Sequence, residues 1–181
     1  TNGAGVYIVA VGEHVIALLL AVVHGIVPSV RNMAEKQWPA IPMLGNVNGK
    51  TIAVIGYGAQ GRAQALCMRD SGLSVVIGIR PGKSKDAAEE DGFETLSVTD
   101  AAKRADIIHI LLPDEMHGPV YDKEIAPVLT AGKTLSFSHG FSIVFGEIKP
   151  PKDVDVFMIA PKAPGHTVRS EFVEGKGTPC L

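Results

Sequence analysis

Cysteine is scarce in this sequence. The 181 residues include only two, Cys67 and Cys180, and they form neither a disulfide framework nor the paired spacing of a structural metal site. Cys67 falls in the first predicted helix of the main domain, where a buried thiol is the ordinary interpretation. We therefore expect a protein of a reducing compartment and assign it to the cytoplasm.

An excess of charge of one sign is also absent. Lysine and arginine number 17, aspartate and glutamate number 19, and the formal net charge is −2. This balance gives no electrostatic basis for binding nucleic acid or an anionic membrane surface. The apolar run Val15–Val23 is too short to cross a bilayer, and no basic segment precedes it as in a signal peptide. We expect neither nucleic acid nor a membrane among the partners.

Residues 1–45 contain few charges, and we expect them to form an N-terminal helical arm and linker. They carry four charged side chains, and Ala10–Val27 predicts a helix that is apolar almost all round and ends at Pro28. A helix of this kind has to be covered on most faces. Two interpretations stay open: an arm at a homodimer interface, or an internal core helix.

The main domain, residues 46–181, is organised around a glycine turn. Thr51–Ile55 predicts a buried strand, and Gly56, Gly58 and Gly61 follow it at G-x-G-x-x-G spacing. A helix, Gln60–Asp70, and a second strand, Ser74–Ile79, then complete a βαβ unit. In such units the diphosphate of a dinucleotide lies on the free N–H groups at the helix N-terminus. A purely structural turn is the alternative interpretation.

The alternation of strands and helices continues and predicts an α/β fold with a Rossmann-like, doubly wound parallel sheet. Further strands are expected at Glu94–Leu96, Asp106–Leu112, Lys133–Phe137 and Val154–Ala160. Further helices are expected at Asp86–Asp91, Glu115–Leu129 and Phe141–Glu147, and another helix, capped by Thr99 or Asp100, is expected to end at Arg104. Right-handed crossovers bring the carboxyl ends of the strands to one edge. The loops expected there are Gly56–Gly61, Arg80–Lys85, Pro113–His117, Ser138–Phe141 and Pro161–Gly165.

The residues after the second strand indicate the cofactor. Domains that bind NAD usually place a carboxylate there for the ribose 2′-hydroxyl, whereas this strand ends in Ile79-Arg80. Lys83, Ser84 and Lys85 follow, and cationic and hydroxyl groups bind a 2′-phosphate. We therefore predict NADP(H) rather than NAD. The alternative is a solvated basic loop.

Four motifs together resemble ketol-acid reductoisomerase (acetohydroxyacid isomeroreductase) from about residue 49 onward. They are FSHGF (137–141), APKAPGHTVRSEFVEGKGTPCL (160–181), GYGAQGRAQA and HILLPDE. The resemblance implies an enzyme of valine and isoleucine biosynthesis. Such an enzyme moves an alkyl group within a 2-hydroxy-2-acyl acid such as acetolactate and then reduces the ketone with NADPH, with magnesium assisting.

The resemblance also implies roles for individual residues. His139 and Lys162 would be catalytic, and His139 follows a strand in a glycine-flanked loop where a histidine can reach substrate. Lys162 and Gly165 would lie near the nicotinamide. Besides the three motif glycines and Gly165, the expected cofactor residues are Tyr57, Ala59 and Gln60 at the diphosphate, Arg80, Lys83, Ser84 and Lys85 at the 2′-phosphate, and Asp114, Glu115, Met116 and His117 along the nucleotide.

The sequence departs from the reductoisomerase pattern in places. Ala59 and Arg62 stand where the family usually has serine and histidine, and Arg62 could replace some of the lost phosphate contact. The family's magnesium ligands lie on a following helical domain that this sequence lacks, and we find no metal site here. We therefore expect the chain alone to bind NADPH without completing the reaction.

The arm has a resemblance of its own. Its A-V-x-E-H-V-x-x-L-L-L pattern resembles the dimerisation helix of D-2-hydroxyacid dehydrogenases, including formate dehydrogenase. Two alternatives to the reductoisomerase interpretation follow. One is an NAD-dependent dehydrogenase of that type, which the missing carboxylate after the second strand disfavours. The other is a dinucleotide-binding module without catalysis.

Overall fold

The computed structural model describes residues 49–180. The predictions for residues 1–45, namely the helical arm, its resemblance to a dehydrogenase helix and its part in a dimer, lie outside the described residues.

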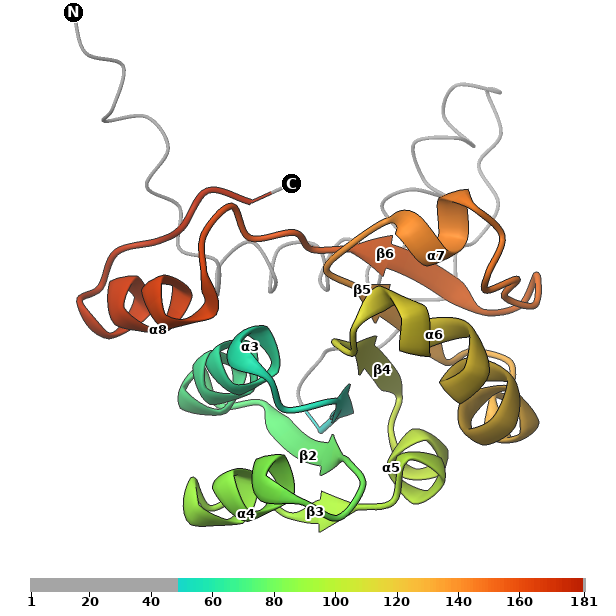
Figure 1. Cartoon of the computed structure of the whole chain (residues 1–181), viewed down its shortest axis with the longest axis horizontal. Helices are drawn as coiled ribbons and strands as arrows, with labels where there is room; N and C mark the ends of the chain where they lie inside the picture. Colours follow the sequence, from blue (N-terminus) through green and yellow to red (C-terminus); the bar gives the residue numbers. More distant parts are fainter. Residues whose placement is uncertain (1–48, 181) are drawn as a thin grey trace, which may run out of the picture.

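A six-stranded sheet with strand order β3-β2-β1-β4-β5-β6 forms the centre of the domain (Figure 1). All its pairings are parallel, and β1 lies between β2 and β4. The chain thus winds outward from β1 in both directions, which confirms the doubly wound prediction. The strands are β1 (Thr51–Ile55), β2 (Ser74–Gly78), β3 (Thr95–Leu96), β4 (Ile107–Ile110), β5 (Thr134–Phe137) and β6 (Asp155–Met158).

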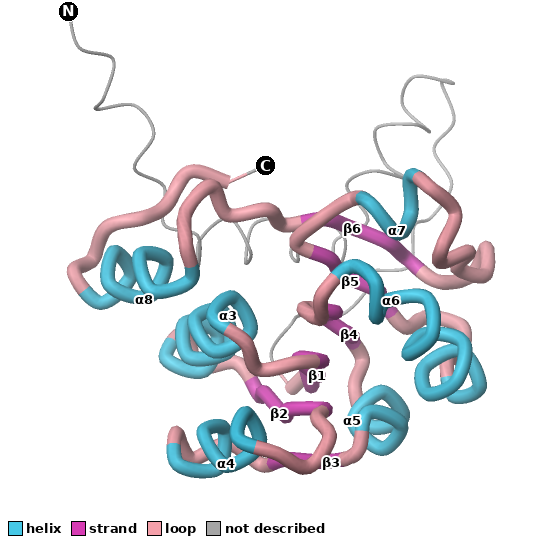
Figure 2. Tube along the Cα trace, in the orientation of Figure 1, coloured by secondary structure: helices cyan, strands magenta, loops and turns pink. Residues whose placement is uncertain are grey.

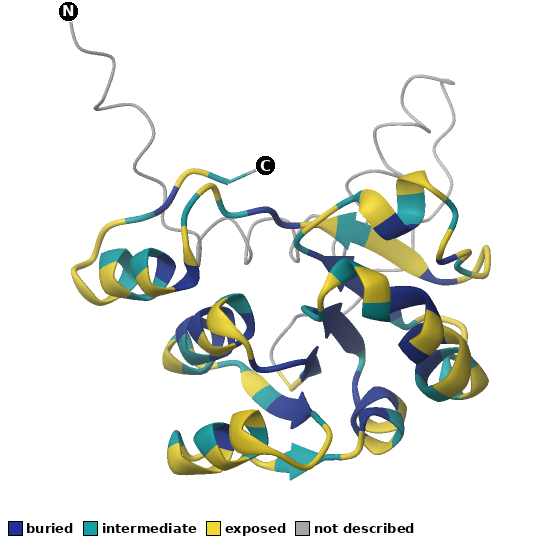
Figure 3. Ribbon diagram, in the orientation of Figure 1, coloured by how far each residue is buried: buried dark blue, intermediate teal, exposed yellow. Residues whose placement is uncertain are grey.

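Helices cover both faces of the sheet (Figure 2). On one face lie α3 (Ala59–Asp70), α4 (Lys83–Glu90) and α8 (Gly165–Val173), and on the other lie α5 (Val98–Arg104), α6 (Asp114–Val120) and the π-helical turn η2 (Tyr121–Ile125). Alternate side chains along each strand point to opposite faces of the sheet and pack against the helices on both sides. Ile52 and Val54 join the core beneath α3, whereas Ala53 and Ile55 join the core beneath α5. Figure 3 shows the central strands as the most buried part of the domain.

Two helix starts differ from the predictions. The first turn of α4 is formed by Lys83, Ser84 and Lys85, which were expected in a loop. Gly82 ends the turn after Pro81, and the charged residues that follow favour a helix. The cap of α5 is Ser97 rather than Thr99 or Asp100. The Ser97 hydroxyl accepts a 3.1 Å hydrogen bond from the Asp100 backbone N–H and thereby fixes the first turn two to three residues earlier.

The single helix predicted over Glu115–Leu129 is wrong. The segment divides into α6, η2 and the 3₁₀ turn η3 (Ala126–Val128). Two prolines, Pro119 and Pro127, lack the N–H that a continuous α-helix needs, and the backbone changes its hydrogen-bond spacing accordingly. The helix after β5, α7 (Phe141–Val144), is also shorter than predicted and is followed by Gly146 at a φ of 72°.

The carboxyl ends of the strands meet at one edge, as predicted. Among residues 49–180, no helix is both long and apolar enough to span a bilayer.

Candidate functional site

The glycine turn between β1 and α3 contains two glycines required by packing and one facing open space. Gly56 has a φ of 99°, and a Cβ there would lie 2.9 Å from the Leu111 carbonyl oxygen. A Cβ on Gly61 would overlap the Gly56 carbonyl group, whereas a Cβ on Gly58 would meet nothing within 4 Å. Gly58 also caps α3 without a side-chain hydrogen bond. The open Gly58 and the uncapped helix start leave room and N–H donors for an anion.

A cleft of about 430 Å³ opens beside this turn, at the carboxyl edge of the sheet. One wall continues from the glycine turn, the opposite wall belongs to α5 and α6, and the residues between β2 and α4 close one end. None of the lining residues is acidic. They are Gly56, Tyr57, Gly58, Gly78, Ile79, Arg80, Pro81, Gly82, Lys83, Ser84, Val98, Leu111, Leu112, Pro113, Met116 and Val120.

The cleft brings together seven of the predicted cofactor residues from three separate segments. These are Gly56, Tyr57, Gly58, Arg80, Lys83, Ser84 and Met116. The apolar wall that includes Val98 and Val120 was not predicted. A helix face that borders a ligand has the same apolar pattern as one that borders the core, so the sequence held nothing to distinguish them.

The basic end of the cleft is built from Arg80 and the first turn of α4. Arg80 is exposed and donates a 3.1 Å hydrogen bond to Glu124 of η2. Lys83 and Ser84 line the cleft, whereas Lys85 forms an i,i+4 ion pair with Glu89 at 3.4 Å and does not line it. Arg80 and Lys83, together with the neutral hydroxyl of Ser84, therefore form a basic end to an otherwise apolar cleft.

His139 lies on the loop after β5 and faces Asp114 at the start of α6. Its Nδ1 is 3.3 Å from an Asp114 carboxylate oxygen and equally far from the Phe141 backbone N–H. The neutral ring can accept from Phe141, whereas the protonated ring donates to Asp114. With its side chain 67% exposed, His139 is open to a ligand.

His117, predicted to border the nucleotide, is turned into the protein. Its Nδ1 lies 2.7 Å from the Ser142 hydroxyl and its Nε2 lies 2.8 Å from the Leu112 carbonyl oxygen. Because a carbonyl only accepts, Nε2 carries the proton and Ser142 donates to Nδ1. The ring thus joins the loop after β4 to α7.

Gln60, predicted at the diphosphate, belongs to a chain of hydrogen bonds under the same edge. Its side-chain amide donates to the Ala163 carbonyl oxygen at 2.8 Å. The buried Gln64 amide donates to Gln60 and to the Ser138 hydroxyl, and its oxygen accepts from His109 Nε2 at 2.8 Å. These bonds connect the loops that carry His139 and Lys162 to α3 and β4, and the sequence pattern did not predict them.

His109 confirms the prediction of a packed mid-strand histidine. It is 3% exposed, and burial lowers its pKa to about 4. The ring is therefore neutral at pH 7, with Nε2 donating to Gln64.

Lys162 lies on the segment between β6 and α8, and Gly165 is the first residue of α8. A Cβ on Gly165 would overlap the Ala59 carbonyl group, so its missing side chain allows α8 to approach the start of α3. Lys162 is exposed, and its backbone N–H donates to the Pro179 carbonyl oxygen at 2.8 Å. Ala59, Gln60, Gly61, Gly165, Lys85, Asp114, Glu115 and His117 lie outside the cleft lining, and their contact with a nucleotide stays a prediction.

Arg62 reaches the carboxylate of Asp91, which also binds Tyr57 of the glycine turn. Its guanidinium pairs with Asp91 through bonds of 2.6 and 2.9 Å, so its charge is already neutralised by a protein carboxylate. This pairing leaves Arg62 poorly placed to replace a lost phosphate contact. Within residues 49–180, no three histidine, cysteine or acidic side chains gather where they could hold a metal ion.

Comparison with known proteins confirms the resemblance found in the sequence. A family model described as "Acetohydroxy acid isomeroreductase, NADPH-binding domain" matches residues 46–181. The "Ketol-acid reductoisomerase (NADP(+))" of Akkermansia muciniphila is 68% identical over 138 residues, which are 76% of this chain and 42% of that protein. The chain thus spans less than half the length of this relative. The family model and this relative support the reductoisomerase interpretation over the dehydrogenase alternative for residues 46–181.

Solved structures agree with this result. An NADH-preferring ketol-acid reductoisomerase from an uncultured archean is 55% identical, with a TM-score of 0.72 over 75% of this chain and 43% of that one. A semialdehyde dehydrogenase NAD-binding protein from Cupriavidus necator, solved with calcium and NAD, is 23% identical with a TM-score of 0.55 over 62% of this chain and 41% of that one. This second likeness concerns the fold alone.

Proposed function

Because this chain belongs to the acetohydroxy acid isomeroreductase family, as that family's NADPH-binding domain, we propose that it supplies the cofactor half of a ketol-acid reductoisomerase. The proposed reaction moves an alkyl group within a 2-hydroxy-2-acyl acid and then reduces the ketone, as in valine and isoleucine biosynthesis. The observation that carries the proposal is the cleft. It joins an open glycine turn to a cationic end without an acidic lining residue.

The cleft suits NADP(H) in its walls and its charge. The N–H groups at the start of α3 would hold the diphosphate, where the helix dipole also favours an anion. Arg80, Lys83 and Ser84 would hold the 2′-phosphate, and the apolar wall formed by Val98, Met116 and Val120 would cover the uncharged part of the adenosine. When bound, the nicotinamide supplies the hydride.

His139 and Lys162 are the proposed catalytic residues of this chain. Both are exposed on loops at the carboxyl edge of the sheet, and the hydrogen bonds of Gln64 and Gln60 hold those two loops. His139 would exchange a proton with the substrate, and its Nδ1 has the Asp114 carboxylate and the Phe141 N–H as neighbours. Lys162 would attract the substrate carboxylate.

Magnesium, which the family uses, does not fit the residues described. Residues 49–180 hold no acidic cluster with the oxygen ligands that this ion prefers, and no step is assigned to it here. We also propose a cytoplasmic location and a homodimer formed through residues 1–45.

Replacing Arg80 by alanine is expected to weaken NADPH binding about tenfold or more and to leave NADH binding unchanged. A guanidinium–phosphate hydrogen bond contributes about 1.5–3 kcal/mol, and NADH has no 2′-phosphate to lose it. Calorimetric titration of the chain with each nucleotide measures both affinities. Folding should be unaffected, because the Arg80–Glu124 pair is an exposed one.

Lys85→Ala serves as the matched control. It removes a nearby cation, in the first turn of α4, that is paired with Glu89 and lies outside the cleft lining, so NADPH affinity should fall clearly less than in Arg80→Ala and NADH affinity should not change. Equal NADPH and NADH affinity in the wild-type chain, or binding of neither, would refute the NADP(H) assignment. The NADH preference of the archaeal relative makes this comparison the decisive one for the cofactor.

A further inference from the structure

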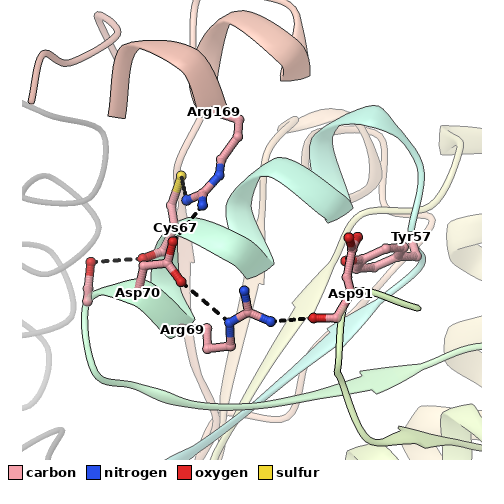
Figure 4. Close-up of polar contacts among 7 residues, drawn as sticks. Tyr57, Cys67, Arg69, Asp70, Asp91 and Arg169 are labelled. Carbon is pink, nitrogen blue, oxygen red and sulfur yellow. Dashed lines mark hydrogen bonds and ion pairs between the residues drawn. The ribbon is translucent and has the colours of Figure 1, made fainter. Parts of the chain in front are cut away.

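Asp91, the residue that follows α4, accepts hydrogen bonds from the glycine turn and from α3, both of which are remote from it in the sequence. The Tyr57 hydroxyl of the glycine turn donates to one carboxylate oxygen at 2.7 Å. Arg62 of α3 donates to both oxygens, at 2.6 and 2.9 Å. Arg69, about two turns further along α3, donates to the Asp91 carbonyl oxygen at 2.5 Å. Figure 4 shows Tyr57 and Arg69 converging on Asp91.

The electrostatics of this group are consistent with a fixed, charged carboxylate. The Arg62 hydrogen bonds hold the pKa of Asp91 below its usual range, with Tyr57 adding to the effect. Burial, and then the bond to Asp91, raise the pKa of Tyr57, so the phenol remains a proton donor. The carboxylate is 17% exposed and therefore only weakly screened by solvent.

Tyr57 is held on its ring as well as on its hydroxyl. The side chain is 5% exposed and packs edge-on against Phe93 at a centroid distance of 5.8 Å. Phe93 also lies under the Arg69 guanidinium, 4.7 Å from the ring centroid. Tyr57 lines the cofactor cleft. The turn after α4 thus holds Tyr57 of the glycine turn in place by a hydrogen bond from its hydroxyl to Asp91 and by an aromatic contact with Phe93.

The helix α4 joins this anchor to the basic end of the cleft. It starts at Lys83 and Ser84, which line the cleft, and ends one residue before Asp91. Ala88 is its only buried residue, so core packing alone holds the helix weakly. Figure 3 shows α4 as largely exposed. Because a helix moves as a rigid rod, fixing its carboxyl end fixes the position of its first turn.

We infer that Asp91 is a positioning residue for cofactor selection. By tying α4 to Tyr57 and α3, it sets the separation between the diphosphate-binding turn and the residues that meet the 2′-phosphate. Asp91 itself does not line the cleft. The inference rests on the proposed binding of NADP(H) in this cleft, and it adds a residue that the resemblance to the family did not supply.

The test compares the NADPH and NADH affinities of Asp91→Ala, Asp91→Asn and the wild-type chain. Loss of the anchor should lower NADPH affinity about tenfold and NADH affinity much less, because only NADPH depends on the first turn of α4. Asp91→Asn keeps an acceptor for Tyr57 but loses the charge that holds Arg62, and its ratio of affinities should fall between the other two.

Asp70→Ala is the matched control. Asp70 is also paired with arginines on α3 and α8, at 3.4 Å from Arg69 and 2.5 Å from Arg169, but it lies at the far end of this network (Figure 4). Its loss should lower thermal stability and leave the ratio of NADPH to NADH affinity unchanged. An equal fall in the ratio for this variant would reduce the Asp91 effect to general destabilisation and overturn the inference.

The outcomes separate this inference from the proposed function. A wild-type chain that binds no NADPH contradicts the function itself. A wild-type chain that discriminates between the nucleotides, with an Asp91→Ala ratio within about twofold of it, keeps the function and overturns the role of Asp91. Should Asp91→Ala not fold, the Asp91→Asn ratio decides: a lowered value supports the role, and an unchanged one overturns it.

Discussion

Replacing Gly165 by alanine is expected to destabilise the protein by about 3 kcal/mol, although the change adds one methyl group. The new Cβ would overlap the backbone carbonyl of Ala59, which cannot move aside as a flexible side chain can. The first turn of α8 must therefore lift from α3, and the contact of the buried Val168 with the core would be lost with it. Urea unfolding of the two chains measures the difference in the free energy of unfolding.

Gly58→Ala is the informative control, because it is the same substitution at a glycine with free space. No atom lies within 4 Å of the position of its Cβ, and its φ of −80° suits alanine. We expect the free energy of unfolding to change by no more than about 0.5 kcal/mol, the cost of a poorer helix cap, while NADPH affinity falls. Equal stability of Gly165→Ala and wild type would show that α8 does not pack on α3 as described.

The second large effect is a loss of stability in mild acid, caused by His109. Burial lowers the pKa of His109 to about 4 in the folded protein, whereas an unfolded chain takes up that proton near pH 6.5. Between these values the unfolded state binds more protons, so the free energy of unfolding falls as the pH falls from 6.5 to 4. The expected contribution is about 3 kcal/mol, present in full above pH 6.5 and lost below it.

The substitution His109→Leu isolates this contribution. The variant should be less stable at pH 7, because Gln64 loses its buried donor, yet its stability should fall less steeply between pH 6.5 and 4. The carboxylates whose pKa values are lowered by arginine, Asp70 and Asp91, titrate alike in both proteins and cancel in the comparison. Parallel curves of stability against pH would rule out a neutral buried His109.

Local patterns were sufficient for the sheet and for the glycine turn. β-Branched runs such as Ile52–Ile55 specify strands over a few residues, and their regular alternation with helices leaves few topologies open. The exact residue at which each helix starts was harder to predict, because several neighbouring residues could each end the loop or cap the helix. Pro81-Gly82 favoured a loop that Lys83 ends, and Ser97 outcompeted Thr99 as a cap because of the position of its hydroxyl.

The candidate site divided in the same way. Arg80, Lys83 and Ser84 were predictable, because strand order fixes where the residues after β2 must lie. The directions in which the Gln60 and His117 side chains point were not predictable, since a polar side chain beside a predicted site can face the ligand or form hydrogen bonds that hold neighbouring loops. Here Gln60 reaches Ala163 across 103 residues of sequence, and His117 bonds Ser142 of another helix.

The sequence by itself determined the sheet, the glycine turn and the basic end of the cleft, because each depends on periodicity or on residues close together in the chain. Only the tertiary structure decided that Asp91 holds Tyr57, that Gly165 admits α8 against α3 and that Lys85 turns away from the cleft. These contacts join segments whose spacing along the chain carries no periodic pattern. Their energies depend on distance and burial, which exist only once the chain has folded.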